Sequence, residues 1–250
     1  MKQVLRHICA KKRAYDQLPL FEWMRDQGLS PRERLAFYPC MAFFILSFGD
    51  LNKFVLREER PGDLLQDMVN THTLEDDHHW PWYLEDFGKL GFDAELRGTE
   101  WMNFLWGEET LQNRVLMARL TALIYGTTSL ERLVIIEAIE ETGNVLFSTM
   151  LPLADAIEQE IGEGLRFCGH FHFNMESGHT VGANHQALAN IALRSLEQDR
   201  CIRLVDDVFN AFEAWTHELL RYAQTHPVLT SMASSTWRID GTAEDDAESA

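Results

Sequence analysis

Apolar residues in this chain of 250 recur with the period of an α-helix along most of its length, and strand signals are sparse. Two of the periodic segments begin with predicted N-caps, Ser30 before Pro31 and Ser129 before Leu130. No low-complexity linker divides the chain, so we expect an all-α bundle of long antiparallel helices. It would form one domain over residues 1–238, followed by an acidic disordered tail over 239–250. The predicted helices lie at about 17–28, 31–57, 62–90, 98–125, 128–160, 164–180, 184–199 and 201–225.

Charge narrows the class of partner. The chain has 39 Asp and Glu against 22 Lys and Arg, a formal net charge of −17. Nonspecific nucleic-acid binding requires a basic surface, so we expect no nucleic-acid partner. Cysteines that are far apart in sequence favour neither a zinc knuckle nor a disulfide framework. They are Cys9, Cys40, Cys168 and Cys201.

Targeting signals are weak. The N-terminal segment "MKQVLRHICAKKRAYDQ" lacks the long apolar core and the small-residue cleavage site of a secretion signal. The most apolar run, "FYPCMAFFILSF", is shorter than the roughly 20 residues that cross a bilayer. We therefore expect a cytoplasmic protein without a membrane partner, and we leave a homodimer open.

One spacing of histidines and a carboxylate, H-x3-[D/E]-x2-H, occurs twice, in segments 70–87 and 169–182. On a helix, residues at i, i+4 and i+7 fall within an arc of roughly 60° on one face. Pro81, inside the predicted helix 62–90, is expected to kink it by removing a hydrogen bond to the carbonyl of Asp77. The residues of the two motifs are His72, Asp76 and His79, and then His172, Glu176 and His179.

Imidazole and carboxylate groups together are typical ligands of non-haem iron, manganese or zinc. Two such helix faces packed against each other could enclose a pair of metal ions, as in the helical bundles of carboxylate di-iron proteins. The alternative is that these histidines are exposed or form ordinary hydrogen bonds. The repetition of the spacing favours metal.

A third helix strengthens that hypothesis. The segment "LERLVIIEAIEETGNVLF" is apolar almost all round and should be deeply buried, yet Glu137 and Glu140 interrupt it. A buried carboxylate without a partner is costly, and a cation is a natural partner. A salt bridge to Arg114 or Arg119 is the alternative. The choice between Glu137 and Glu140 stays open at this point.

Three segments together resemble the haem-oxygenase-like iron-containing redox enzymes, over about residues 30 to 225. That family includes di-iron oxidases and oxygenases, and it shares its fold with the thiaminase-type TenA proteins. The segments are "NTHTLEDDHHWPWYLEDFGKLG", "IEAIEETG" and "GHFHFNMESGH".

The resemblance implies a haem-oxygenase-like multi-helix bundle that binds iron, as two ions, with manganese or zinc as alternatives. It implies a small-molecule substrate that is oxidised with dioxygen. His172, Glu176 and His179 would be ligands, and Glu137 or Glu140 would bridge. The chain departs from the family at His72, where many members have a glutamate, which implies a shell richer in nitrogen. Asp76 matches a carboxylate of the fatty-acid decarboxylating members.

Three rival functions follow from the same residues. A haem oxygenase would hold haem through an early histidine, and His7 is the only early candidate. A TenA-like hydrolase would need a nucleophilic cysteine at a pocket, and Cys168 lies near the second motif. The third is a non-catalytic protein that binds a metal or a ligand.

Overall fold

The computed structural model of the protein describes residues 1–60, 62–93, 95–180 and 189–227, with the backbone alone over 176–180. Every regular element in these ranges is helical, which confirms the all-α fold class. The predicted tail, 239–250, lies outside the described residues. The elements are α1 (Lys2–Tyr15), α2 (Pro19–Arg25), α3 (Pro31–Arg34), η1 (Tyr38–Met41), α4 (Ala42–Leu51), η2 (Asn52–Leu56), α5 (Leu64–Asp76), α6 (Trp80–Lys89), α7 (Gly98–Trp106), η3 (Glu108–Thr110), α8 (Leu111–Ile124), α9 (Ser129–Ile161), α10 (His170–Thr180) and α12 (Ser195–Thr225).

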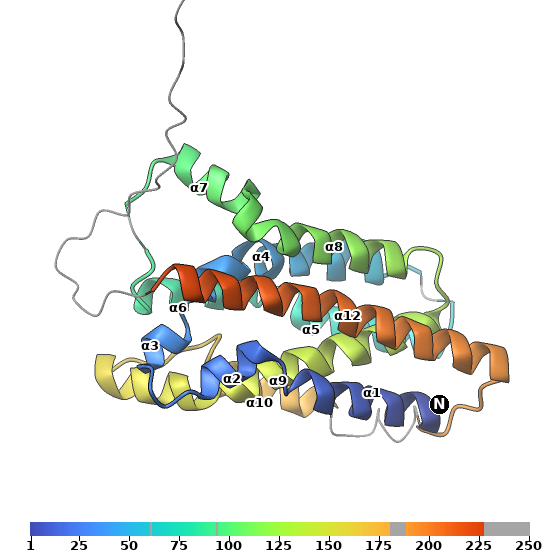
Figure 1. Ribbon diagram of the computed structural model, residues 1–250. Coiled ribbons are helices and arrows are strands. Elements are labelled where there is room, and N and C mark those ends of the chain that lie inside the picture. Colours follow the sequence, from blue (N-terminus) through green and yellow to red (C-terminus); the bar gives the residue numbers. More distant parts are fainter. Residues whose placement is uncertain (61, 94, 181–188, 228–250) are drawn as a thin grey trace, which may run out of the picture.

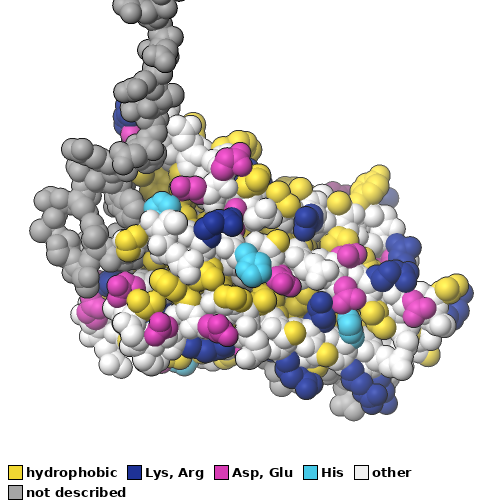
Figure 2. Space-filling view, in the orientation of Figure 1, with side chains coloured by type: hydrophobic (Ala, Val, Ile, Leu, Met, Phe, Trp, Pro, Cys, Tyr) yellow, Lys and Arg dark blue, Asp and Glu magenta, His cyan; other side chains and the backbone are white. Residues whose placement is uncertain are grey.

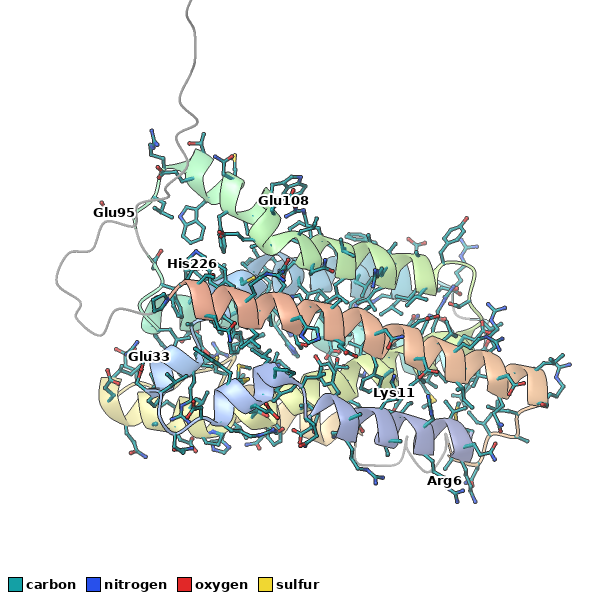
Figure 3. The ribbon with its side chains drawn as sticks, in the orientation of Figure 1. Arg6, Lys11, Glu33, Glu95, Glu108 and His226 are labelled. Carbon is teal, nitrogen blue, oxygen red and sulfur yellow. The ribbon has the colours of Figure 1, made fainter. Side chains whose placement is uncertain are left out.

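The two longest of these helices, α9 and α12, pack against each other at the centre of the bundle. Helices α1 and α8 pack on α12, while α5 and α10 pack on α9. Figure 1 shows α8, α12 and α1 running alongside one another, with α7 projecting beyond the end of α8. Side chains fill the space between these helices (Figure 3), and the buried apolar residues form one connected core.

Helix α9 has clear start and stop signals. The hydroxyl of Thr128 accepts a hydrogen bond from the backbone N–H of Glu131, and the Glu131 carboxylate accepts one from the backbone N–H of Thr128. Thr128 is therefore the N-cap, and the prediction of Ser129 was wrong by one residue. The helix ends at Ile161 and is followed by its C-cap Gly162, whose φ of 75° favours glycine. Ser30 is the predicted N-cap, with a capping box to Glu33.

Several predicted boundaries were wrong. Helix α1 was not predicted at all, although Val4, Leu5 and Ile8 form a buried stripe along it. Of the predicted helix 184–199, residues 184–188 lie outside the described residues, residues 191–194 are not helical, and Ser195 begins α12. Other predicted helices are divided or shortened: 31–57 into α3, η1, α4 and η2, 62–90 into α5 and α6, 98–125 into α7, η3 and α8, and 164–180 to α10.

The helical run Pro31–Leu56 is long and apolar enough to cross a membrane by length and composition alone. This corrects the expectation, based on its most apolar dozen residues, that it is too short. In the fold, 72% of its apolar window is buried. The face in Figure 2 carries acidic and basic side chains interspersed among apolar ones.

Candidate metal centre

An internal cavity of about 80 Å³ lies between α4, α9, α10 and α12, next to the junction of α5 and α6. Four side chains from the sequence motifs reach it: Asp76, His79, Glu140 and His172. All four are buried. The remaining lining is mainly aromatic and aliphatic, so this polar group is concentrated on an otherwise apolar surface.

His72, Asp76 and Glu140 form a compact trio beside this cavity. Nε2 of His72 lies 2.9 Å from Oδ2 of Asp76 and 3.1 Å from Oε1 of Glu140. One potential ligand atom from each residue lies within 4.8 Å of the other two. The trio joins α5 to α9, and its member on α9 is Glu140, which lies next to His72.

His72 balances the charge of its two neighbours. Burial alone would lower the pKa of His72, but the negative charges of Glu140 and Asp76, together with the hydrogen bond between His72 and Glu140, raise it to about 12. The protonated imidazole thus occupies the position of a cation between two carboxylates.

Asp76 is the least satisfied member of the trio. Only 3% of the residue is exposed, and neither carboxylate oxygen forms a hydrogen bond of normal geometry. The 2.9 Å approach of His72 Nε2 is therefore a charge contact rather than a well-directed hydrogen bond. A buried carboxylate in this state fits a bound cation, because an ion needs no hydrogen-bond direction.

His79 and His172 meet at the cavity from different elements. Nε2 of His172 lies 3.0 Å from Nδ1 of His79, and Nδ1 of His172 lies 3.0 Å from the carbonyl oxygen of Phe167. Because a carbonyl only accepts, Nδ1 of His172 carries the proton and Nε2 is left with its lone pair. That tautomer is the one in which Nε2 can bind a metal.

A break between α5 and α6 places His79 at the cavity. The prediction of one helix carrying His72, Asp76 and His79 was wrong, because α5 ends at Asp76 and His79 is the N-cap of α6. Pro81 lies in the first turn of α6, where its missing N–H costs nothing, so it begins a helix rather than kinking one.

The break is held by α4 and the residue that follows η2. The guanidinium of Arg57 donates to the carbonyl oxygen of Thr73 and to Oδ2 of Asp77, both at 2.7 Å. Gly49 allows the backbone of α4 to approach, because a Cβ there would lie 2.7 Å from the carbonyl oxygen of Asp77. These contacts fix the end of α5 and with it Asp76.

Asp86, which sequence reasoning missed, holds the loop that precedes α10. Its fully buried carboxylate accepts hydrogen bonds from the backbone N–H groups of Arg166, Phe167 and Cys168, at 2.8, 2.8 and 2.9 Å. The same loop presents the carbonyl of Phe167 to His172. Asp86 therefore positions His172 through the loop.

The remaining predicted residues are placed as follows. Glu137 is half-buried on α9 and does not line the cavity. The side chains of Glu176 and His179 lie outside the described residues, although the backbone of α10 includes both positions. Arg114 donates to the carbonyls of Leu105 and Gly107 instead of pairing with Glu140.

Two of the rival functions lose support from the geometry. Burial, together with the charge of Asp86, raises the pKa of the Cys168 thiol well above its usual range, which disfavours a nucleophilic thiolate. His7 lies 2.8 Å from Oδ1 of Asp206 and does not line the cavity, so it is not placed to hold haem there.

No protein-family model matches the chain, and none of the curated proteins compared with it is significantly similar in sequence. The resemblance to haem-oxygenase-like iron enzymes therefore stays a prediction, and the site has to be interpreted from its own residues.

Proposed function

We propose that the protein is a non-haem iron oxidoreductase that uses dioxygen to oxidise a small metabolite. The observation that carries the proposal is the trio of His72, Asp76 and Glu140, which is largely removed from solvent and has ligand atoms within 4.8 Å of one another beside a cavity. Trios of this kind, one imidazole and two carboxylates, suit iron, manganese and zinc. Iron is the preferred choice because of the sequence resemblance.

The donor set supports more than one ion. His72, Asp76 and Glu140 supply one group of ligands, and His79 and His172 lie on the same cavity. On α10, His172 is followed by Glu176 and His179 at helical spacing. A second ion would take its ligands from this second group.

Each part of the chain has a distinct role in this proposal. Iron, when bound, would supply the activation of dioxygen. Asp76 and Glu140 would supply negative charge to hold the ion, and the Phe167 carbonyl would keep the proton of His172 on Nδ1. The apolar walls of the cavity would exclude water from the reacting groups.

The test is the iron content of protein produced with iron supplied, measured by elemental mass spectrometry. We expect about two iron ions per chain and oxygen consumption after reduction, following the family resemblance and the paired donor groups. Glu140→Gln should lose most of the iron. Glu141→Gln, an adjacent change in a carboxylate that pairs with Lys12, is the matched control and should retain it.

Two outcomes would contradict the proposal. Wild-type protein free of iron after loading would overturn the metal assignment. Iron bound in full, without oxygen consumption under any reducing condition, would favour a non-catalytic metal-binding protein instead.

A further inference from the structure

Gly143 is an unexplained glycine in the middle of α9. Glycine destabilises a helix interior relative to alanine, so its presence there needs a reason. Its backbone is helical, and a Cβ would lie 3.6 Å from the nearest atom, Cε2 of Phe147, which is ordinary contact. Neither backbone conformation nor close packing therefore requires glycine at this position.

The cavity supplies the reason. Gly143 lines it, one turn along α9 from Glu140. Without a side chain, Gly143 leaves open the space next to the metal-binding trio. At about 80 Å³ the cavity is several times the space that one water needs. Apolar cavities of about 150 Å³ bind benzene, and this cavity has about half that volume, so the group that fits it is smaller than a benzene ring.

The walls of this space are apolar. Its polar lining groups beyond the candidate ligands are engaged or neutral: the Thr142 hydroxyl donates to the Ile139 carbonyl at 2.7 Å, and burial raises the pKa of Tyr15 well above its usual value. Trp80 lines the cavity and is also 39% exposed, so it stands between the cavity and solvent. The apolar lining includes Phe44, Phe48, Leu146, Phe147, Phe212 and Trp215.

Charge excludes one class of ligand. None of the described lining residues is Lys or Arg, and the sequence of segment 176–188, which follows on α10 and beyond, contains neither. Asp76 and Glu140 add negative charge to the same surface. An anionic group entering the apolar part would lose its hydration without gaining a cationic partner from the protein.

We infer that the apolar part of the cavity binds a small uncharged hydrocarbon group of the substrate, and that Gly143 sets the size of the group that fits. This inference rests on the proposed function only in calling the bound molecule a substrate. The binding itself is a property of the cavity and can be measured on metal-free protein.

The experiment titrates metal-free protein with dichloromethane and, separately, with acetate, which has a similar shape and a negative charge, using isothermal titration calorimetry. We expect dichloromethane to bind at least tenfold more tightly than acetate. Gly143→Ala should weaken dichloromethane binding about tenfold, because one added methyl group in a small apolar pocket costs this much. It should not lower the melting temperature, because alanine favours the helix.

Gly88→Ala is the matched control. Gly88 is an exposed glycine inside α6 with nothing within 4 Å of an added Cβ, so the change should leave dichloromethane binding unaltered. Absence of dichloromethane binding, equal binding of acetate, or unchanged dichloromethane binding in Gly143→Ala would each overturn the inference. Iron content, measured separately, would then still decide the proposed function.

Discussion

Oε1 of Glu140 on α9 lies 3.1 Å from Nε2 of His72 on α5, although the two residues are 68 positions apart in the sequence. Through this contact, residues from two segments that are far apart in the sequence form one cluster with Asp76. Because Glu140 and Asp76 are both buried carboxylates, a positive charge is needed between them. The protonated His72 supplies it in the protein alone, and a metal ion would supply it in the loaded form.

His72→Ala is expected to destabilise the metal-free protein, because it leaves two buried carboxylates without their cation. Breaking a buried pair in this way costs about 3 kcal/mol or more. In the double variant with Glu140→Ala, part of that loss should be recovered, because one of the repelling charges is gone. The measurement is urea unfolding of wild type, both single variants and the double variant. Strictly additive losses would show that the two residues do not interact.

His179→Ala is expected to lower the iron content more than His72→Ala, with both variants still folded. His179 belongs to the motif that matches the family pattern more closely, and loss of a strong imidazole ligand should cost metal outright. Iron per chain and helical circular dichroism are measured on variants loaded identically. If His179→Ala retained as much iron as wild type, the residue could not be a ligand.

Asp86→Asn is expected to destabilise the protein by about 1–3 kcal/mol, because an amide NH₂ would face backbone N–H groups that now donate to a carboxylate. Since the same loop orients His172, iron affinity should fall as well. Asp93→Asn, an exposed change, is the control and should alter neither. A loss of stability with full iron affinity would mean that Asp86 is structural and does not position His172.

Gly49→Ala should destabilise the fold, although alanine favours a helix. The added Cβ would meet the carbonyl oxygen of Asp77 at 2.7 Å and force α4 away from the junction of α5 and α6. Overpacking of this kind costs about 1–3 kcal/mol. Thermal unfolding checks it against Gly88→Ala, which should be neutral or stabilising. Equal stability of the two variants would show that α4 can shift freely.

The Asp206 carboxylate, where α12 meets α1, is expected to make the stability of the fold depend on pH. Burial would raise its pKa, but His7 and Lys11 lower it below the usual value. Figure 3 labels Lys11 on α1. Because the pKa of Asp206 is lowered in the folded state, its ionised carboxylate stabilises the fold above about pH 4. This stabilisation is lost as the pH falls further. Asp206→Asn should therefore lower the melting temperature slightly at pH 7 and much less at pH 3. Asp207→Asn, an exposed neighbour, is the control, and a difference independent of pH would contradict the assignment.

Sequence periodicity was enough for the fold class and for the extent of α9, because this segment is apolar almost all round: the predicted helix 128–160 matches Ser129–Ile161, although its N-cap was misplaced by one residue. It was not enough for the junction of α5 and α6. The polar residues 77–79 fit a helical pattern as well as they fit a turn, so the break was missed and Pro81 was assigned to a kink.

The candidate site, too, could be predicted only in part from the sequence. Residue types and spacing identified His72, Asp76 and Glu140 as candidates, but helical phase could not choose Glu140 over Glu137, since that depends on which face of α9 meets α5. Asp86 left no local signal, because its partners are backbone N–H groups about 80 positions away. Long-range contacts to the backbone carry no residue-type signature.

The most direct test of the central claim is anomalous scattering at the iron absorption edge, measured on crystals of protein loaded with iron. The account predicts an anomalous peak within bonding distance of His72, Asp76 and Glu140. Iron peaks elsewhere in the protein, with no peak at the intact trio, would contradict the account.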